Sequence, residues 1–299
     1  MKKKGTAGEV IFQIANYTIF GLFTLICILP FYYLFINTIS DNSLVSQGLI
    51  LWKPKGIHFT NYMEVLKMKG LGNSALISVG RTVLGTVLNV FGTAFLGYAL
   101  GKQELWGRKF WYRFVIITMY FNAGIIPWFI NMKNLGLTNN FLAYIIPGII
   151  SPFSLILFKT YAENLPASLE ESAQLDGAGY GALFLKIIMP LCKPIVATIA
   201  VFSAVGQWNS FTDTLFLMSD SRYYTLQFIL YQYLNEANAI ANSLRSSMEN
   251  GIAADPSLLI TPTAIKMTVS MVVVLPILFV YPLFQRYFVS GIMIGAVKG

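Results

Sequence analysis

The tightest group of carboxylates in the chain is formed by Glu170, Glu171 and Asp176, which fall within seven residues. Paired carboxylates can act as a general acid and a general base. Such chemistry also needs a histidine, a metal cluster or an activated nucleophile beside them, and the only histidine is His58, remote in the sequence. Neither a histidine-dependent site nor a metal site can be assembled, so the sequence predicts that these acids are not catalytic and that the chain is not an enzyme.

A nucleotide site would need the phosphate-binding pattern G-x-x-x-x-G-K-[ST]. The nearest match is GYALGK, from Gly97 to Lys102, but its spacing is one residue short and Gln103 follows the lysine. The stretch also ends an apolar run, which favours a small-residue face for helix packing. The sequence therefore predicts that this chain binds no cofactor of its own.

The elements that carry these residues are strongly apolar. Of the 299 residues, 56% are hydrophobic and only 11% are charged, against roughly 25% charged residues in soluble domains. Runs of about 20 apolar residues are long enough to cross a membrane as helices. These features predict an all-α, multi-pass protein of the cell membrane.

Six membrane spans are expected, at 14–37, 73–101, 111–132, 139–161, 189–216 and 263–286. With both termini in the cytoplasm, the inner side carries twelve Lys and Arg residues and the outer side seven, as the positive-inside rule favours. The first span is too long for a signal-peptide core, and no A-x-A-like cleavage site follows it.

This topology divides the chain into three parts: a cytoplasmic lead at 1–13, a single transmembrane domain at 14–288 and a cytoplasmic tail at 289–299. The two long outer segments are 40–72 and 217–262. The second is polar, and its composition is equally compatible with a docking surface and with a solvated connection.

A few polar groups are expected at membrane depth, where they are functional candidates by default. They are Arg81, Asn89, Asn122, Gln207 and Asn209. The two cysteines, Cys27 and Cys192, fall in or beside apolar spans and are expected to be small buried hydrophobes rather than a disulfide.

The acidic group belongs to a polar hairpin at 168–188. Ser168 and Glu171 have the S-x-x-E spacing of a capping box, which predicts that a helix begins there. Gly177 is suited to ending that helix in a left-handed conformation, and Gly179 and Gly181 would allow a second turn. An interfacial helix is the alternative, but such helices favour Lys and Arg, whereas acids and small residues favour docking in a partner protein's groove.

The stretch ESAQLDGAGYGALFLKIIMP resembles the EAA loop of importer-type ABC transporter permeases, E-A-A-x3-G-x9-I-x-L-P. Ser172 replaces the first alanine of the pattern and Met189 replaces its leucine, both with residues of similar size. GLILWKPKGIHFTNY, FNAGIIPWFINMKNLGLTNN, GQWNSF and YPLFQRYFVSGIMIGAVKG also resemble carbohydrate-importing permeases of the maltose-transporter type, in the branch that handles complex oligosaccharides.

This resemblance implies a type I importer fold and a subunit that forms half of an oligosaccharide path. The implied partners are a second permease, two cytoplasmic ATPases that bind ATP and Mg²⁺, and an extracellular solute-binding lipoprotein. The hairpin would be the coupling helix seated on an ATPase, through Glu171, Ser172, Ala173, Asp176, Gly177, Ile187 and Pro190. The tail would add a second ATPase contact, through Gly291, Gly295 and Lys298.

Aromatic and amide side chains suit sugar rings, which stack their apolar faces and hydrogen-bond their hydroxyls. The candidates for the sugar path are Tyr120, Asn122, Trp128, Trp208 and Asn209; each could instead line a helix interface or a membrane belt. A permease for another polar solute, such as a sugar phosphate or a peptide, is the alternative within this class. A membrane scaffold or receptor is the alternative outside it.

Overall fold

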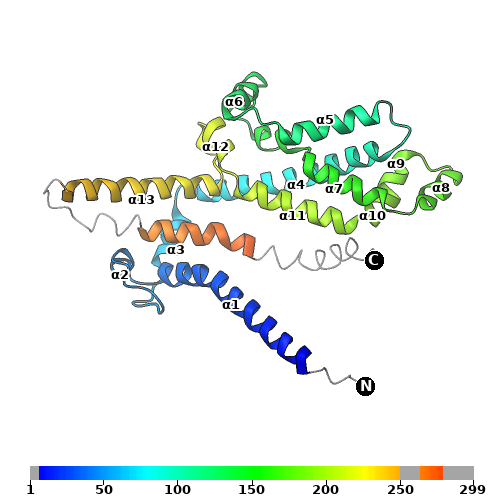
Figure 1. The fold of residues 1–299 in the computed structure, drawn as a ribbon. Coiled ribbons are helices and arrows are strands. Elements are labelled where there is room, and N and C mark those ends of the chain that lie inside the picture. Colours follow the sequence, from blue (N-terminus) through cyan, green and yellow to red (C-terminus); the bar gives the residue numbers. More distant parts are fainter. Residues whose placement is uncertain (1–6, 250–262, 279–299) are drawn as a thin grey trace. The chain divides into compact units, whose positions relative to one another are not determined.

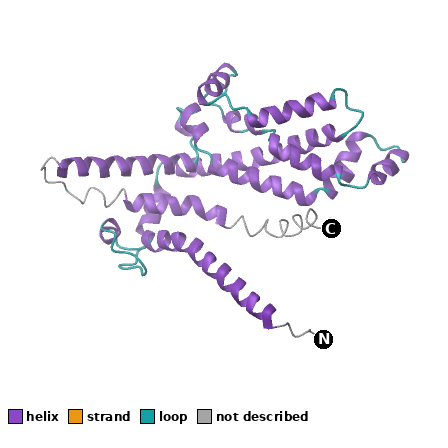
Figure 2. Ribbon diagram, viewed as in Figure 1, coloured by secondary structure: helices purple, strands orange, loops and turns teal. Residues whose placement is uncertain are grey.

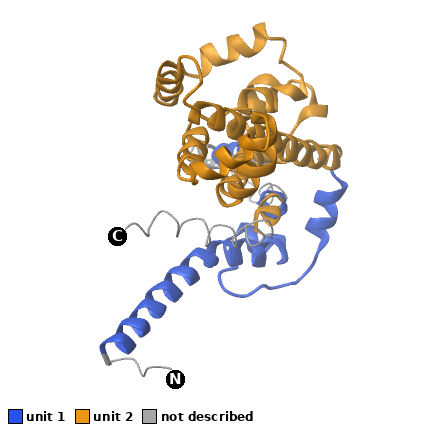
Figure 3. Cartoon of the chain, turned by 90° about the vertical axis from the view of Figure 1, so that its right-hand side faces the viewer, with its two compact units in different colours: residues 1–68, 232–272 blue, residues 69–231, 273–299 orange. Residues whose placement is uncertain are grey.

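The computed structural model describes residues 7–249 and 263–278. Every regular element in these residues is helical, with no strand (Figures 1 and 2), which confirms the predicted all-helical class. The chain divides into two compact units (Figure 3): residues 1–68 with 232–272, and residues 69–231 with 273–299.

The first unit begins with α1 (Ala7–Thr38), a helix of 32 residues with a proline inside it at Pro30. Its apolar side chains are exposed over most of its length, from Val10 to Phe35. Exposure of such an apolar surface to water is unfavourable, whereas the hydrocarbon core of a bilayer accommodates it. The short helices α2 (Asn42–Ser46) and α3 (Thr60–Lys67) follow it.

The segment 217–262, for which the composition is compatible with a docking surface and with a solvated connection, is helical over much of its length. It contains the helix α13 (Leu226–Glu249), which is 24 residues long. A further helix, Thr263–Leu278, follows.

The second unit is built around α4 (Leu71–Gly101), which packs along α7 (Pro152–Glu163) and α11 (Lys193–Asn209). Its other helices are α5 (Arg108–Tyr120), α6 (Ile125–Asn134), α8 (Ala167–Leu175), α9 (Tyr180–Ala182), α10 (Met189–Leu191) and α12 (Thr212–Leu217). Short helical turns complete it: η1 (Phe141–Tyr144), η2 (Ile146–Gly148), η3 (Leu183–Ile188) and η4 (Ser221–Tyr223).

The close approach of α4 to α7 depends on Gly97. A Cβ atom there would lie 3.1 Å from both the Leu155 carbonyl oxygen and a Phe158 ring carbon. The prediction that the GYALGK stretch provides a small-residue face for helix packing is confirmed at this residue, because small residues allow helix backbones to approach closely.

Two of the six expected spans are continuous helices. By length and composition, α1 from Gly8 onward and α4 are the two described helices that could cross a membrane, or up to five spans if each sharply bent pair counts as one. The bends are 118° between α5 and α6, 44° between the η1–η2 segment and α7, and 83° between the Tyr180–Leu191 segment and α11. The expected spans at 111–132, 139–161 and 189–216 each contain one of these bends, and as bent spans they remain predictions.

These breaks have local causes. Between α5 and α6, Gly124 has φ +86°. Its backbone N–H donates a hydrogen bond to the side-chain oxygen of Asn122 at 2.8 Å, which forms a turn. Around Cys192, Pro190 and Pro194 each lack the N–H that a continuous helix needs. The last expected span, 263–286, is helical to Leu278, and its remainder lies outside the described residues.

The cysteine expectation was half right. Both cysteines are free, and Cys192 is buried in the core beside Phe184 and Ile199. Cys27, however, is exposed, because it lies on α1, where most of the apolar side chains are exposed.

Candidate functional site

The polar hairpin predicted at 168–188 is present, but its first helix begins differently. α8 starts at Ala167 with Pro166 as its N-cap, and no side chain caps it. The predicted capping box was therefore wrong, since Ser168 lies inside the helix. Pro166 defines the start of the helix instead: its ring fixes φ near −60°, and its carbonyl accepts a hydrogen bond from the N–H of Leu169 at 3.2 Å.

The end of α8 matches the prediction. Gly177 has φ +81°, and its N–H donates to the Gln174 carbonyl at 2.9 Å. The N–H of Ala178 donates to the Ala173 carbonyl at 2.9 Å. This pair of hydrogen bonds is a Schellman motif, which satisfies carbonyls that the helix end leaves free. Gly179 has φ −75° and Gly181 lies inside α9, so the predicted second glycine turn does not form.

The returning limb of the hairpin is anchored in the core of the second unit. Leu183, Phe184 and Ile188 of η3 are all buried. The Phe184 ring lies edge-on to Phe95, with centroids 5.6 Å apart, and 5.5 Å from the Tyr98 ring, both on α4. A displacement of this limb must therefore move α4 with it, because close-packed interiors transmit strain.

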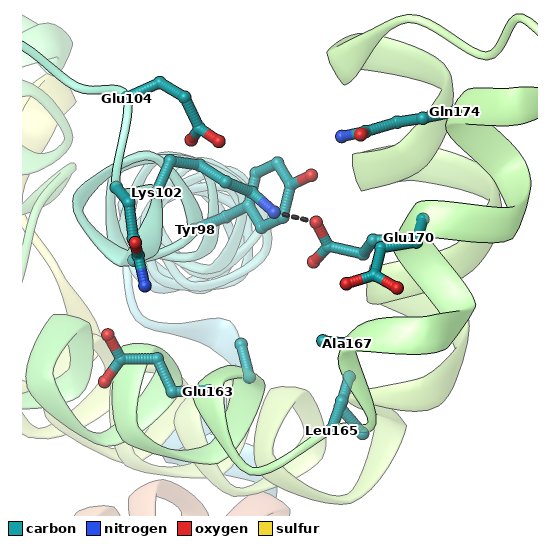
Figure 4. A pocket seen from close by; sticks show the side chains of 12 residues that line it. Tyr98, Lys102, Glu104, Glu163, Leu165, Ala167, Glu170 and Gln174 are labelled. Carbon is teal, nitrogen blue, oxygen red and sulfur yellow. Dashed lines mark hydrogen bonds and ion pairs between the residues drawn. The ribbon is translucent and has the colours of Figure 1, made fainter.

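A second link joins α8 itself to the end of α4. The ammonium of Lys102, the residue that ends α4, forms an ion pair with the Glu170 carboxylate (Figure 4). The same ammonium lies 4.3 Å from the centre of the Tyr98 ring. Burial lowers the pKa of Lys102, and the nearby Glu104 carboxylate opposes that shift. Both partners line a polar pocket of about 410 Å³.

Glu163, at the end of α7, forms ion pairs with two cations near this pocket, Arg108 and Lys159. Its carboxylate accepts from Arg108 Nη2 at 2.8 Å and from Lys159 Nζ at 2.7 Å. Arg108 also donates from Nε to the Leu100 carbonyl, at 3.0 Å. The start of α5 and the ends of α4 and α7 are thus joined around one carboxylate.

The predicted docking residues lie mostly on the outside of the hairpin. Glu171, Ser172, Asp176, Gly177 and Pro190 are exposed, Ala173 is half-buried, and Ile187 packs against the core. The prediction omitted Leu175, which is 89% exposed on the same helix. Its signal was a leucine directly before the helix-ending Asp-Gly pair. The predicted tail contacts at Gly291, Gly295 and Lys298 lie outside the described residues.

A polar cluster surrounds Arg81 in the middle part of α4. The guanidinium forms an ion pair with Asp213 at 2.6 Å and donates to the Gln207 side-chain oxygen at 3.0 and 3.1 Å. It also donates to the Ser210 carbonyl at 3.2 Å and lies 4.4 Å from the Tyr144 ring centre. The Arg81 side chain is only 3% exposed, and a charge buried at this depth requires such pairing.

This cluster borders an open pocket of about 360 Å³. Trp128 and Asn89 also line it, and Asn89 donates to the Gly148 carbonyl at 2.6 Å. Sequence reasoning did not single out Asp213, although a carboxylate inside an expected span was a signal that could have found it.

The other candidates for the sugar path lie elsewhere. Trp208 lines an apolar groove and donates from Nε1 to the Val273 carbonyl at 3.0 Å. Tyr120 and Asn209 are exposed at the ends of α5 and α11, and Asn122 forms the turn before α6. Of the five candidates, the structure places Trp128 alone in the lining of the 360 Å³ pocket beside Arg81.

Comparison with known proteins assigns this architecture to a family. Residues 93–294 match the model of the binding-protein-dependent transport system inner membrane component. The chain is 35% identical to Protein LplC of Bacillus subtilis over 98% of its own length and 96% of that protein's. It is 34% identical to the polygalacturonan/rhamnogalacturonan transport system permease protein YtcP of the same organism, over 97% and 99% respectively.

The fold also matches a solved structure, a chain of a bacterial ABC transporter involved in the import of the acidic polysaccharide alginate. The TM-score is 0.81 at 30% identity, over 96% of this chain and all of that one. The chain thus has the ABC importer permease fold, and the chain belongs to the family of binding-protein-dependent transport system inner membrane components, the non-enzymatic permease subunits of ABC importers.

Proposed function

We propose that this permease imports oligosaccharides and that the hairpin at 168–188 couples it to an ATPase. The observation that carries the coupling role is the double attachment of the hairpin to α4, through the Lys102–Glu170 ion pair and the buried Phe184 ring. The outer face of α8, with Glu171 and Leu175, remains exposed for a partner. The relative named for polygalacturonan/rhamnogalacturonan transport and two relatives named for arabinooligosaccharides transport support the cargo class.

The proposed topology has six spans with both termini in the cytoplasm. Three of the spans would be bent, namely the α5–α6 pair, the η1–η2–α7 segment and the segment from Tyr180 to Asn209. Bent membrane segments are compatible with a bilayer where the freed backbone groups are satisfied within the protein. The hairpin then lies on the cytoplasmic side, where an ATPase can reach it.

The proposed partners are a second permease, two ATPases that bind ATP and Mg²⁺, and an extracellular solute-binding lipoprotein. ATP drives the cycle through its different affinity for two states of the ATPase pair, because a ligand shifts an equilibrium only by its differential affinity. The tail from Gly291 to Lys298 is proposed as a second ATPase contact.

The proposed sugar path runs past the polar pocket beside Arg81. Trp128 supplies an aromatic face there, and Asn89, Ser203 and Gln207 supply polar groups. Pockets that combine aromatic walls with a few polar groups are typical small-molecule sites. Tyr120, Asn122, Trp208 and Asn209 remain candidates for other parts of the path.

The direct test is to purify the tagged chain gently from its native membrane and to identify what accompanies it. We expect a second permease, an ATPase and a sugar-binding lipoprotein, whose bound glycan identifies the cargo. Recovery of the chain alone, under conditions in which related transporters stay assembled, would contradict the proposal.

A further inference from the structure

The segment 49–59, which follows α2 in the first unit, carries an unusual surface for a connection. Five of its large apolar side chains are more than half exposed: Leu49, Leu51, Trp52, Ile57 and Phe59. Lys53 and Lys55 are exposed between them. A soluble loop of this composition would present an apolar patch to water, and such patches mark interaction sites.

Backbone pairing gives this segment a fixed shape. The Asp41 N–H donates to the Lys55 carbonyl at 2.9 Å, and the His58 N–H donates to the Ile39 carbonyl at 2.9 Å. Gly56 has φ +63°, and a Cβ atom there would lie 3.0 Å from the Asp41 Cβ. The exposed side chains are therefore held by an ordered backbone.

The segment also folds back along α1. The Tyr32 hydroxyl donates to the Trp52 carbonyl at 2.8 Å. Leu29 and Tyr33 line one cavity together with Leu51 and Trp52. Trp52 is thus level with residues that lie well before the end of α1 at Thr38.

The length of α1 allows the depth of Trp52 in a membrane to be estimated from its contact with Tyr32. Its apolar part, Gly8–Thr38, has 31 residues and is therefore roughly 46 Å long at about 1.5 Å per residue. A bilayer has a hydrocarbon core of about 30 Å within about 40–45 Å including headgroups. A centred α1 extends about 8 Å beyond the hydrocarbon at each end, and Tyr32 lies about 9 Å before Thr38.

We propose that the segment 49–59 is an interfacial anchor, which inserts Trp52 and its apolar neighbours at the boundary between headgroups and hydrocarbon. Trp and Tyr are enriched at this level because their rings have apolar bodies and polar edges. Lys53 and Lys55 face the phosphates there, since lysines bury their stems in apolar surroundings and keep the ammonium in the headgroup layer. The ligand is the lipid headgroup region at the membrane face where α1 ends.

The test measures where Trp52 lies, in the assembled transporter reconstituted into phosphatidylcholine–phosphatidylglycerol vesicles. Subtracting the emission of the Trp52→Phe variant from that of the wild type isolates this one tryptophan among the five in the chain. Phosphatidylcholine brominated near the headgroup end of its acyl chains is expected to quench this component strongly. Aqueous iodide is expected to quench it weakly.

Trp106→Phe is the matched control, because Trp106 is 86% exposed in the polar connection after α4. Its component should show the reverse pattern. Strong iodide quenching of the Trp52 component would place the segment in water, as a surface free for the binding protein. Quenching by neither agent would mean that another subunit covers it, and either result would overturn the anchor while leaving the transport function untouched.

Discussion

The guanidinium of Arg81 and the carboxylate of Asp213 meet through two parallel hydrogen bonds, at 2.6 Å from Nη2 to Oδ2 and at 3.1 Å from Nη1 to Oδ1. The pair joins α4 to the start of α12, directly after the break at Ser210, whose carbonyl also accepts from Arg81. One side chain therefore neutralises a largely buried acid, whose side chain is 14% exposed, and satisfies a carbonyl that the end of α11 leaves free.

Removal of one member of this pair should be costly. We expect Arg81→Leu to lower the free energy of unfolding by about 3–5 kcal/mol, because it leaves the largely buried Asp213 carboxylate without its cation. The double variant with Asp213→Leu should lose less than the single one, since no unpaired charge remains. Thermal unfolding of the purified protein in detergent provides the comparison. A double variant that is less stable than Arg81→Leu would contradict this account.

The left-handed turn at Gly177 predicts a backbone requirement in the hairpin. A Cβ atom there would touch nothing within 4 Å, so Gly177→Ala should act through strain alone, about 1–2 kcal/mol for a non-glycine residue in this conformation. We expect fewer sugars imported per ATP hydrolysed, because the end of α8 would be displaced.

Gly179→Ala is the matched control, since Gly179 has φ −75° and a Cβ atom there also meets nothing within 4 Å. Uptake and ATPase activity should be measured together in proteoliposomes. Equal effects of the two substitutions would show that the left-handed conformation at Gly177 has no role in coupling.

The Lys102–Glu170 ion pair should contribute to coupling between the hairpin and α4. The side chains are 20% and 22% exposed, so solvent screens the pair in part, and exposed pairs typically contribute about 0.2–1 kcal/mol. We expect Lys102→Glu or Glu170→Lys to reduce transport per ATP by up to about fivefold. The double charge reversal should restore it in part, because the opposite charges face each other again. If the double variant performs no better than the singles, the pair does not transmit motion.

The loop after α1 should depend on pH through Asp41. Its carboxylate caps α2 by accepting from the N–H groups of Ser43 and Leu44, at 2.9 and 3.3 Å. The hydroxyl of Ser43, and then these two N–H groups, lower the pKa of Asp41. A carboxylate whose pKa is lower in the folded state stabilises the fold above its unfolded pKa of about 3.9 and loses that contribution as the pH falls through the folded value.

Hydrogen exchange of the Ser43 and Leu44 amides should therefore show less protection, relative to neighbouring amides, as the pH drops below about 4. In Asp41→Asn the cap persists without a charge, so this relative loss should disappear. A pH dependence that survives in Asp41→Asn would assign it to another group.

The class of the protein and the position of its polar hairpin could both be predicted from the sequence alone. Both depend on local patterns: long apolar runs that only a membrane accommodates, and a short acidic helix that ends at Gly177. Because these signals arise from neighbouring residues, they persist whatever the rest of the chain does. The predicted start of this helix was wrong because α8 already begins at Ala167, directly after Pro166. Ser168 therefore lies inside the helix and cannot cap its N-terminus.

Tertiary structure alone decided which distant residues meet. Asp213 lies 132 positions from Arg81 and Glu170 lies 68 positions from Lys102, and no periodicity in the sequence indicates either pair. Hydropathy also concealed the three bends, because each bent pair of helices is together as apolar as a span and an average over a window does not register the break. Packing also decides which groups satisfy the backbone that a helix end leaves free, as Arg81 does for the Ser210 carbonyl at the end of α11. That information exists only once the helices have packed.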